Sequence, residues 1–240
     1  MPRAKPTPTL TGTSRMTDTA LGPLLLAMRL GSAALPIGAF AYSQALEHAV
    51  AVGAVRDASS AERWILGMLE RSVLTNDVPF LVSLHAAWST GDEARARVLG
   101  DALFATRATR ELREEERQLG RALFRLAGRL GVDVPASSTG ERATLASAFA
   151  LVAARGGIDA RMTAASYAFA WAEAQVGAAT RLVPLGQSEA QLVLSAASSV
   201  LARDLDAAVA RNLDEATSTA PGQAILSAAH ETLHSRIFRS

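Results

Sequence analysis

The sequence of 240 residues contains no cysteine and a single lysine, Lys5. Without cysteine, the chain forms no disulfide, no thiolate metal site and no cysteine nucleophile. Phosphate-binding loops of the Gly-Lys-Ser/Thr type and Schiff-base enzymes both need a lysine at the site, and no Gly-x-Ser-x-Gly nucleophile motif occurs. The sequence therefore lacks the residues for most covalent and phosphoryl-transfer mechanisms.

Aromatic residues make up only 5% of the chain, whereas hydrophobic residues as a whole make up 49%. Alanine and leucine must therefore fill most of the core, and both favour helix, while the residues that favour strands are sparse. The formal net charge is only +1, with positive residues scattered along the sequence, which argues against a nucleic-acid partner. We expect a helical protein that does not bind nucleic acid.

No segment reaches the roughly 20 apolar residues that a membrane helix needs. Arg3 and Lys5 precede a short apolar stretch at residues 21–28, which loosely imitates a signal peptide. Asp18 and Pro23 do not fit such a peptide. We therefore expect no membrane span and a cytoplasmic location.

Composition and periodicity divide the chain into three parts. Residues 1–20 are rich in threonine and proline and lack apolar periodicity, so they are predicted to form a disordered tail. Residues 21–234 are predicted to form one all-α, compact, bundle-like domain of about nine or ten helices, since helical stripes alternate with Gly and Pro breaks and no βαβ pattern is present. Residues 235–240 are predicted to be a C-terminal partner-binding tail.

Individual helices are predicted from their apolar stripes and end signals. Continuous helices are expected over residues 21–32, 39–52, 107–130 and 141–155. Helix starts are expected at Ser59 (with Glu62 as its capping partner), at Asn76-Asp77, at Asp159 or Thr163, and at Ser188. In the third of the continuous helices, the pairs Arg107–Glu111 and Arg110–Glu114 are expected on the solvated side.

One motif suggests metal chemistry. The residues His230-Glu231-Thr232-Leu233-His234 match H-E-x-x-H, a spacing that on a helix places two imidazoles on one face to bind zinc while the Glu activates water. A zinc protease also needs a third protein ligand, and none of the six residues after His234 is His, Asp, Glu or Cys. A metal-dependent hydrolase built on His230, Glu231 and His234 is therefore the alternative interpretation, and a polar face near the C-terminus is the simpler one.

Glu47 and Asp77 are the remaining candidates for catalytic carboxylates. A lone carboxylate is more often a surface or capping group, and neither residue belongs to a recognisable catalytic set. We therefore predict neither catalytic nor metal-binding residues, and no cofactor. The polar and aromatic residues around the helix breaks suit a binding surface better than an active site.

Three segments together resemble the UreF family of urease accessory proteins. The first is Leu35-Pro36-Ile37-Gly38-Ala39-Phe40-Ala41-Tyr42-Ser43-Gln44-Ala45-Leu46-Glu47, the second is Arg181-Leu182-Val183-Pro184-Leu185-Gly186-Gln187, and the third is His230-Glu231 with Ser235-Arg236-Ile237-Phe238-Arg239-Ser240. The order, spacing and terminal placement of the three carry the resemblance. Ala45 replaces the glycine that is usual in the family, which we interpret as a helix-favouring change within a helical segment.

The resemblance implies an all-helical, homodimeric scaffold without enzymatic activity. Its implied partners are UreD (also called UreH), the GTPase UreG and apo-urease, and its implied role is nickel insertion, with a proposed influence on GTP hydrolysis by UreG. An Arg-plus-aromatic tail is typical of interface anchors, and Tyr42 is expected to pin the tail against the break at Leu35–Gly38. The expected partner-binding residues are Pro36, Gly38, Tyr42, Ser43, Glu47, Asp77, His230, Glu231, Arg236, Phe238, Arg239 and Ser240.

Overall fold

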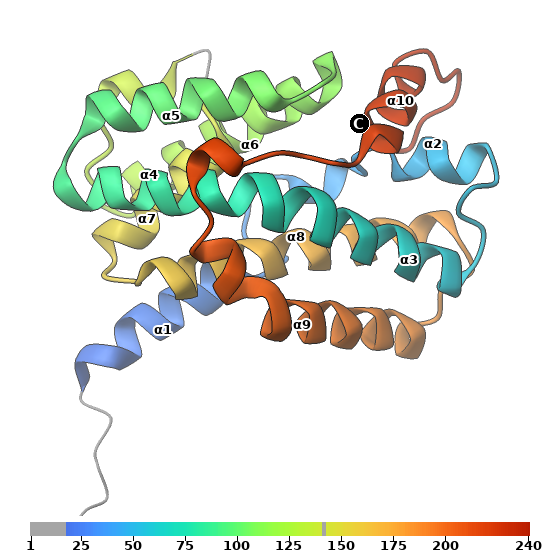
Figure 1. The fold of residues 1–240 in the computed structure, drawn as a ribbon, viewed down its shortest axis with the longest axis horizontal. Helices are drawn as coiled ribbons and strands as arrows, with labels where there is room; N and C mark the ends of the chain where they lie inside the picture. Colours follow the sequence, from blue (N-terminus) through green and yellow to red (C-terminus); the bar gives the residue numbers. More distant parts are fainter. Residues whose placement is uncertain (1–17, 141–142) are drawn as a thin grey trace, which may run out of the picture.

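The computed structural model describes residues 18–140 and 143–240. Within these ranges the chain forms ten α-helices and no strand (Figure 1), which confirms the predicted all-α architecture. The helices are α1 (Asp18–Leu30), α2 (Leu46–Ala51), α3 (Ala58–Met68), α4 (Val78–Thr90), α5 (Glu93–Thr106), α6 (Arg110–Arg129), α7 (Leu145–Arg155), α8 (Ala160–Leu182), α9 (Gln187–Val209) and α10 (Pro221–His230). Three short 3₁₀ turns are η1 (Ala39–Ala41), η3 (Ala136–Thr139) and η4 (Leu213–Glu215), and η2 (Leu69–Asp77) is a π-helical segment.

Helix α1 begins at Asp18, three residues before the predicted start of the folded domain. The rest of the predicted N-terminal tail, residues 1–17, lies outside the described residues. No helix in the described part of the chain combines the length and apolar character needed to cross a bilayer.

Two apolar clusters form the interior. The larger one surrounds α4, which packs against α5, α7 and α8. The smaller one lies among α2, α3, α8 and α9, and it includes Leu46, Ile65, Val176 and, from the far end of the chain, Phe238. Small alanine side chains let these helices approach closely, as the composition predicts.

Helix α6 approaches the backbone just before α7 closely at Gly120. A Cβ atom added at Gly120 of α6 would lie 2.5 Å from the carbonyl carbon of Thr144, immediately before α7. No side chain fits at that distance, so Gly120 is required by packing. Thr144 also caps α7, its hydroxyl accepting a hydrogen bond from the backbone N–H of Ser147; the helix therefore starts four residues later than the predicted 141.

Helices α3 and α4 are joined without a break by η2, a nine-residue π-helical segment. The chain between η4 and α10 crosses this segment (Figure 1), where the backbone N–H groups of Thr217 and Thr219 donate to the carbonyls of Thr75 and Arg71. The wider π-helical turn changes which carbonyls are bonded within the helix, and two of them here accept hydrogen bonds from the crossing chain. Asn76 and Asp77 therefore lie within a continuous helical rod and do not cap a new helix, contrary to the prediction.

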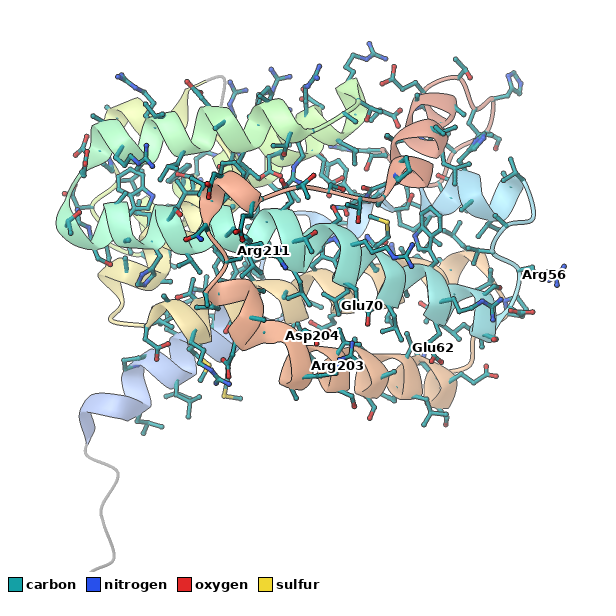
Figure 2. The ribbon with its side chains drawn as sticks, in the orientation of Figure 1. Arg56, Glu62, Glu70, Arg203, Asp204 and Arg211 are labelled. Atoms are coloured by element: carbon teal, nitrogen blue, oxygen red, sulfur yellow. The ribbon has the colours of Figure 1, made fainter. Side chains whose placement is uncertain are left out.

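A surface ion pair also joins η2 to α9. The guanidinium of Arg203 lies 2.7 Å from a carboxylate oxygen of Glu70 and 2.7 Å from one of Asp204, and Figure 2 shows the three side chains facing one another. All three are solvent-accessible, so this contact contributes little to stability.

Two further predicted helix caps are wrong. Helix α3 is capped by Asp57, which accepts from the Ser60 N–H while the Ser60 hydroxyl accepts from the Asp57 N–H; the predicted pair Ser59–Glu62 does not form it. Helix α9 starts after Gly186, whose N–H donates to the Glu189 carboxylate. In both cases the capping residue precedes the predicted one by two positions.

The predicted continuous helix over residues 39–52 is interrupted. Between η1 and α2 the backbone turns sharply, and Gln44 and Ala45 adopt positive φ angles of 52° and 74°. Ala45 therefore has a left-handed backbone conformation. This conformation costs a residue with a Cβ atom roughly 1–2 kcal/mol, a cost that glycine does not have. Our interpretation of Ala45 as a helix-favouring replacement is wrong, because the residue lies at a bend.

Helix α6 begins at Arg110, three residues later than the start predicted for the helix over residues 107–130. Helix α6 is capped by Thr109, whose hydroxyl accepts from the Leu112 N–H, and Arg107 belongs to the connection from α5. The apolar residues Leu119 and Leu123 of α6 are buried, as the apolar stripe predicts. Leu130, just beyond the end of α6, is exposed. The predicted solvated pair of Arg107 and Glu111 does not form, because both side chains are buried with other partners.

We predict opposite effects for two glycine-to-alanine substitutions in α6. Gly120→Ala should lower the free energy of unfolding by about 1–3 kcal/mol, because the added methyl meets backbone atoms of Thr144 and Leu145. Gly128→Ala, which has no atom within 4 Å of the added Cβ, should raise it by up to about 1 kcal/mol through helix propensity. Urea unfolding followed by circular dichroism measures both, and equal effects for the two variants would contradict the proposed close contact.

Candidate functional site

The C-terminal segment, residues 235–240, folds back onto residues 41–47 at the bend before α2. The backbone N–H of Arg239 donates to the carbonyl of Ala41 at 2.8 Å, and both the N–H and the hydroxyl of Ser43 donate to the carbonyl of Ser240, at 2.8 and 2.5 Å. Ser43 and Ser240 are fully buried. The segment is therefore part of the folded surface and not a free tail.

Glu47 holds the middle of this segment. Its carboxylate accepts hydrogen bonds from the backbone N–H groups of Ile237 and Phe238, at 2.7 and 3.0 Å. Burial by itself would raise the pKa of Glu47, but the Ile237 N–H, His230 and the Phe238 N–H together hold that pKa below its usual value. Glu47 is therefore a charged acceptor for two consecutive peptide groups.

His230, the last residue of α10, lies between two carboxylates. Its Nε2 is 3.0 Å from Glu47 and its Nδ1 is 2.7 Å from Glu111 of α6, and the ring is completely buried. A neutral imidazole has one donor and one acceptor, so two such contacts require a second proton, either on the ring or on one of the carboxyls. His230 thereby joins α2, α6 and α10 in one buried cluster.

The same cluster receives two contacts from α6 and the C-terminal segment. Arg236 donates to Glu111 at 2.6 Å, with its guanidinium partly exposed. Glu231 accepts from the backbone N–H of Arg110 at 3.1 Å, at the start of α6. The charges of the buried carboxylates are thus matched by groups from the C-terminal part of the chain.

Glu115, one turn further along α6, contacts both sides of the docked segment. Its carboxyl accepts from the side-chain amide of Gln44 at 2.7 Å and from the hydroxyl of Ser240 at 2.8 Å. Burial, together with the nearby Glu116 carboxylate, raises the pKa of Glu115 to about 7, although the hydrogen bonds from Gln44 and Ser240 lower it. The Glu115 carboxyl is therefore protonated more readily than an ordinary glutamate.

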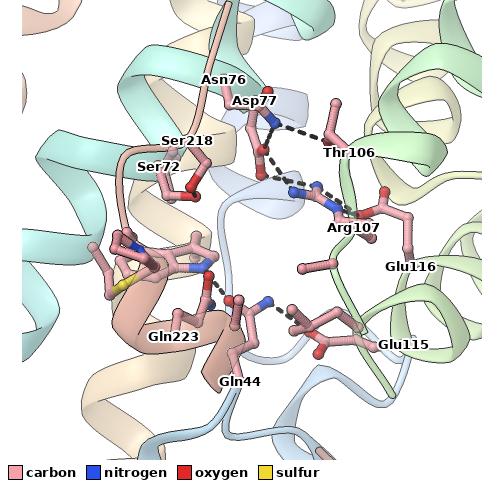
Figure 3. Close-up of a pocket in the computed structure, with 18 residues that line it drawn as sticks. Gln44, Ser72, Asn76, Asp77, Thr106, Arg107, Glu115, Glu116, Ser218 and Gln223 are labelled. Carbon is pink, nitrogen blue, oxygen red and sulfur yellow. Dashed lines mark hydrogen bonds and ion pairs between the residues drawn. The ribbon is translucent and has the colours of Figure 1, made fainter. Parts of the chain in front are cut away.

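A second buried cluster lies beside the first. The guanidinium of Arg107 binds Asp77 at 2.8 Å and Glu116 at 2.7 Å, as the dashed lines in Figure 3 show. Gln44 connects the two clusters, because its carbonyl accepts from the Trp171 indole at 2.8 Å while its amide donates to Glu115.

Two cavities flank the second cluster, of about 210 and 190 Å³. The first, drawn in Figure 3, is lined by residues of η2, α6, the chain before α6 and the chain that leads into α10, and the second reaches toward the turn at residues 35–40. Residues that line both are Gln44, Asp77, Arg107, Glu115, Glu116 and Trp171.

Phe238 fills the smaller apolar cluster with only 4% of its surface exposed. The guanidinium of Arg181 lies 5.8 Å from the Phe238 ring centroid and 6.0 Å from that of Phe40, within the range of cation–π attraction. Phe40 itself is 67% exposed, as is Ile237 at 70%. The docked segment therefore buries one large side chain and presents the adjacent one to solvent.

The structure brings most of the predicted partner-binding residues together. Tyr42, which is buried and lies close to Arg239, joins the residues around Glu47 and His230. Pro36 and Gly38 form the preceding turn, with Gly38 at a φ of 87°, but the segment lies against residues 41–47 and not against that turn, contrary to expectation. Asp77 belongs to the separate Arg107 cluster.

Sequence reasoning missed three residues of the site, Gln44, Glu111 and Glu115. The two glutamates carried a usable signal, because Glu115 follows Leu112 and precedes Leu119 at helical spacing and so lies on the apolar face of α6. Gln44 has no such signal, since its position depends on the bend at Ala45.

The alternative of a zinc hydrolase needs His230 and His234 on one helical face. Helix α10 ends at His230, and His234 lies beyond it in a turn. The two carboxylates near His230 lie on opposite ring nitrogens, and no three His, Asp or Glu side chains in the described ranges gather around a point that could hold a metal ion. The sequence therefore matches H-E-x-x-H, but its two histidines are not arranged as they are in a zinc site.

The fold and this site define an all-helical protein whose surface is completed by its own C-terminal segment. A sequence profile of the UreF family matches residues 55–198. Urease accessory protein UreF of Methylibium petroleiphilum is 40% identical, with 92% of this chain and 96% of the relative aligned. That of Cupriavidus metallidurans is 42% identical (92% and 100%), and UreF 2 of Brucella anthropi is 38% identical (91% and 96%). The chain belongs to the UreF family of urease accessory proteins.

We predict that Glu115 makes stability depend on pH. Its pKa is about 7 in the folded protein, against 4.5 ordinarily, so the folded state binds more protons between these values and stability falls as pH rises from about 4.5 to 7. Glu115→Gln should remove this dependence and raise the free energy of unfolding at pH 8 by about 2–3 kcal/mol.

Urea unfolding at pH 5, 6, 7 and 8 measures this effect. Glu114→Gln is the matched control, because Glu114 is the preceding residue of α6 and its side chain is 40% exposed. A Glu115→Gln variant whose stability follows the wild-type pH profile would show that the buried carboxyl does not titrate in this range.

Proposed function

We propose that the protein is a non-catalytic scaffold of urease maturation, which bridges UreD (UreH) and the GTPase UreG during nickel insertion into apo-urease. Family membership supports the role in urease maturation. The particular partners, a homodimeric state, a cytoplasmic location and an influence on GTP hydrolysis by UreG are part of the same proposal, and they follow from the resemblance.

The observation that carries the docking role is the composite surface made by the C-terminal segment. Six of the predicted partner-binding residues are buried beneath it and hold it in place: Tyr42, Ser43, Glu47, His230, Phe238 and Ser240. A partner that binds the closed form does not reach these side chains. It meets the exposed Ile237 and Phe40 instead, together with Arg236.

The predicted set therefore divides into two roles. Buried residues fix the conformation of the segment, while exposed ones supply contact area. Large apolar side chains and arginines that are exposed on a rigid backbone are favourable contacts for a protein partner, because little entropy is lost when they bind.

We predict different results for substitutions at two adjacent positions. Ile237→Ser should weaken binding to UreD or to UreG about tenfold without lowering the thermal midpoint, because the side chain touches solvent in the free protein. Phe238→Ala should weaken binding and also expose residues 235–240 to protease, because it empties a site in the smaller core. Isothermal titration calorimetry and limited proteolysis measure the two effects.

Leu192→Ser is the control, since Leu192 of α9 is equally exposed, at 68%, and lies away from the segment. Deletion of residues 236–240 removes both roles together. If this deletion leaves binding to UreD and UreG unchanged, the C-terminal segment is not a docking surface.

A further inference from the structure

Helix α6 has an unusual distribution of charge around its axis. Arginines recur every four residues along its outer side, at positions 113, 117, 121, 125 and 129. Arg113, Arg125 and Arg129 are exposed, and Arg117 and Arg121 are partly exposed. Like charges four residues apart on a helix repel one another, so this arrangement disfavours the helix that carries it.

The acidic residues of α6 do not neutralise these arginines, because most of them face inward. Glu111, Glu115 and Glu116 are buried, with partners in the C-terminal segment and in Arg107. Glu114 alone faces outward, where it contacts Arg117 and Gln118. Arg113, Arg125 and Arg129 have no acidic partner among the described residues.

This basic face is continuous with the C-terminal segment. A hollow at the start of α6 is bordered by three arginines, Arg110, Arg117 and, from the C-terminal segment, Arg239, and by two glutamates, Glu111 and Glu114. From there the arginines follow the 20 residues of α6, a length of about 30 Å. Five of the chain's arginines therefore form one band along the outer side of α6.

We propose that the outer face of α6 docks an acidic surface of a partner protein, which extends the footprint of that partner from the C-terminal segment along the helix. The inference rests on the proposed function, because the partner is one of the proteins that assemble with this chain. Arginine suits this role, since its planar guanidinium pairs with carboxylates through two hydrogen bonds at once.

Two other anionic partners fit less well. Nucleic acid is disfavoured because the net charge of the chain is only +1, and because the exposed face of α6 has no aromatic side chain on which a base could stack. A membrane surface is disfavoured because an interfacial helix inserts its apolar side, and the apolar side of α6 is buried in the core.

The test replaces Arg113, Arg125 and Arg129 together with glutamine, which has a similar helix propensity. The matched control replaces Arg29, Arg56 and Arg155, which are exposed residues outside α6; Figure 2 shows Arg56 at the α3 end of the molecule. A third variant places lysine at positions 113, 125 and 129, which preserves the charge.

Dissociation constants are measured for purified UreD and purified UreG at 50 and 200 mM NaCl. The α6 glutamine variant should bind one of them at least fivefold more weakly at 50 mM NaCl, with a smaller loss between the two salt concentrations, because fewer charges pair across the interface. The control should stay within twofold of the wild type. The lysine variant should bind between the wild type and the glutamine variant, because lysine keeps the charge but not the paired hydrogen bonds.

Further probes are a 30-nucleotide single-stranded DNA and vesicles of three parts phosphatidylcholine to one part phosphatidylglycerol. Selective loss of DNA or vesicle binding, with UreD and UreG binding unchanged, would overturn the proposal, as would an equal loss in the control variant. If the wild-type chain binds neither UreD nor UreG, the proposed function itself fails; if it binds and the α6 variant binds equally well, only this inference fails.

Discussion

The burial of carboxylates on the inner side of α6 is the constraint to which the surrounding structure responds. A buried carboxylate must be neutralised by a proton or matched by a cation or by hydrogen-bond donors. Glu116 is matched by Arg107, Glu111 by His230 and Arg236, and Glu115 is partly protonated. Most of these partners come from distant parts of the chain. The buried carboxylates of α6 therefore determine where those parts of the chain pack.

Much of the helical framework follows from local chemistry and was predicted. Helices end at Gly91 and Gly131, which adopt positive φ angles, and Asp159 caps α8 as its sequence position suggests. Such features depend on a few neighbouring residues, which a sequence displays directly. The C-terminal segment was predicted to lie against the break at Leu35–Gly38, whereas it contacts residues 41–47, beside a bend that was not predicted.

Three of the errors share one physical cause, which is that long-range burial overrides local preference. The spacing of Arg107 and Glu111 favours a surface pair, yet each meets a stronger partner in the interior. Asp77 follows Asn76 at what looks like a helix start, but its carboxylate is occupied by Arg107. At Ala45 a side chain that favours helix lies at a bend, because the backbone must turn there to receive Ser240.

The last 20 residues of the chain are attached to the helical core differently from the helices within it. Residues 221–240 are attached to the rest mainly by hydrogen bonds to carboxylates and backbone carbonyls, and Phe238 is the one large apolar side chain there that is fully within the core. Such a unit opens at a lower free energy than the whole domain. The helical core therefore need not unfold for this surface to change.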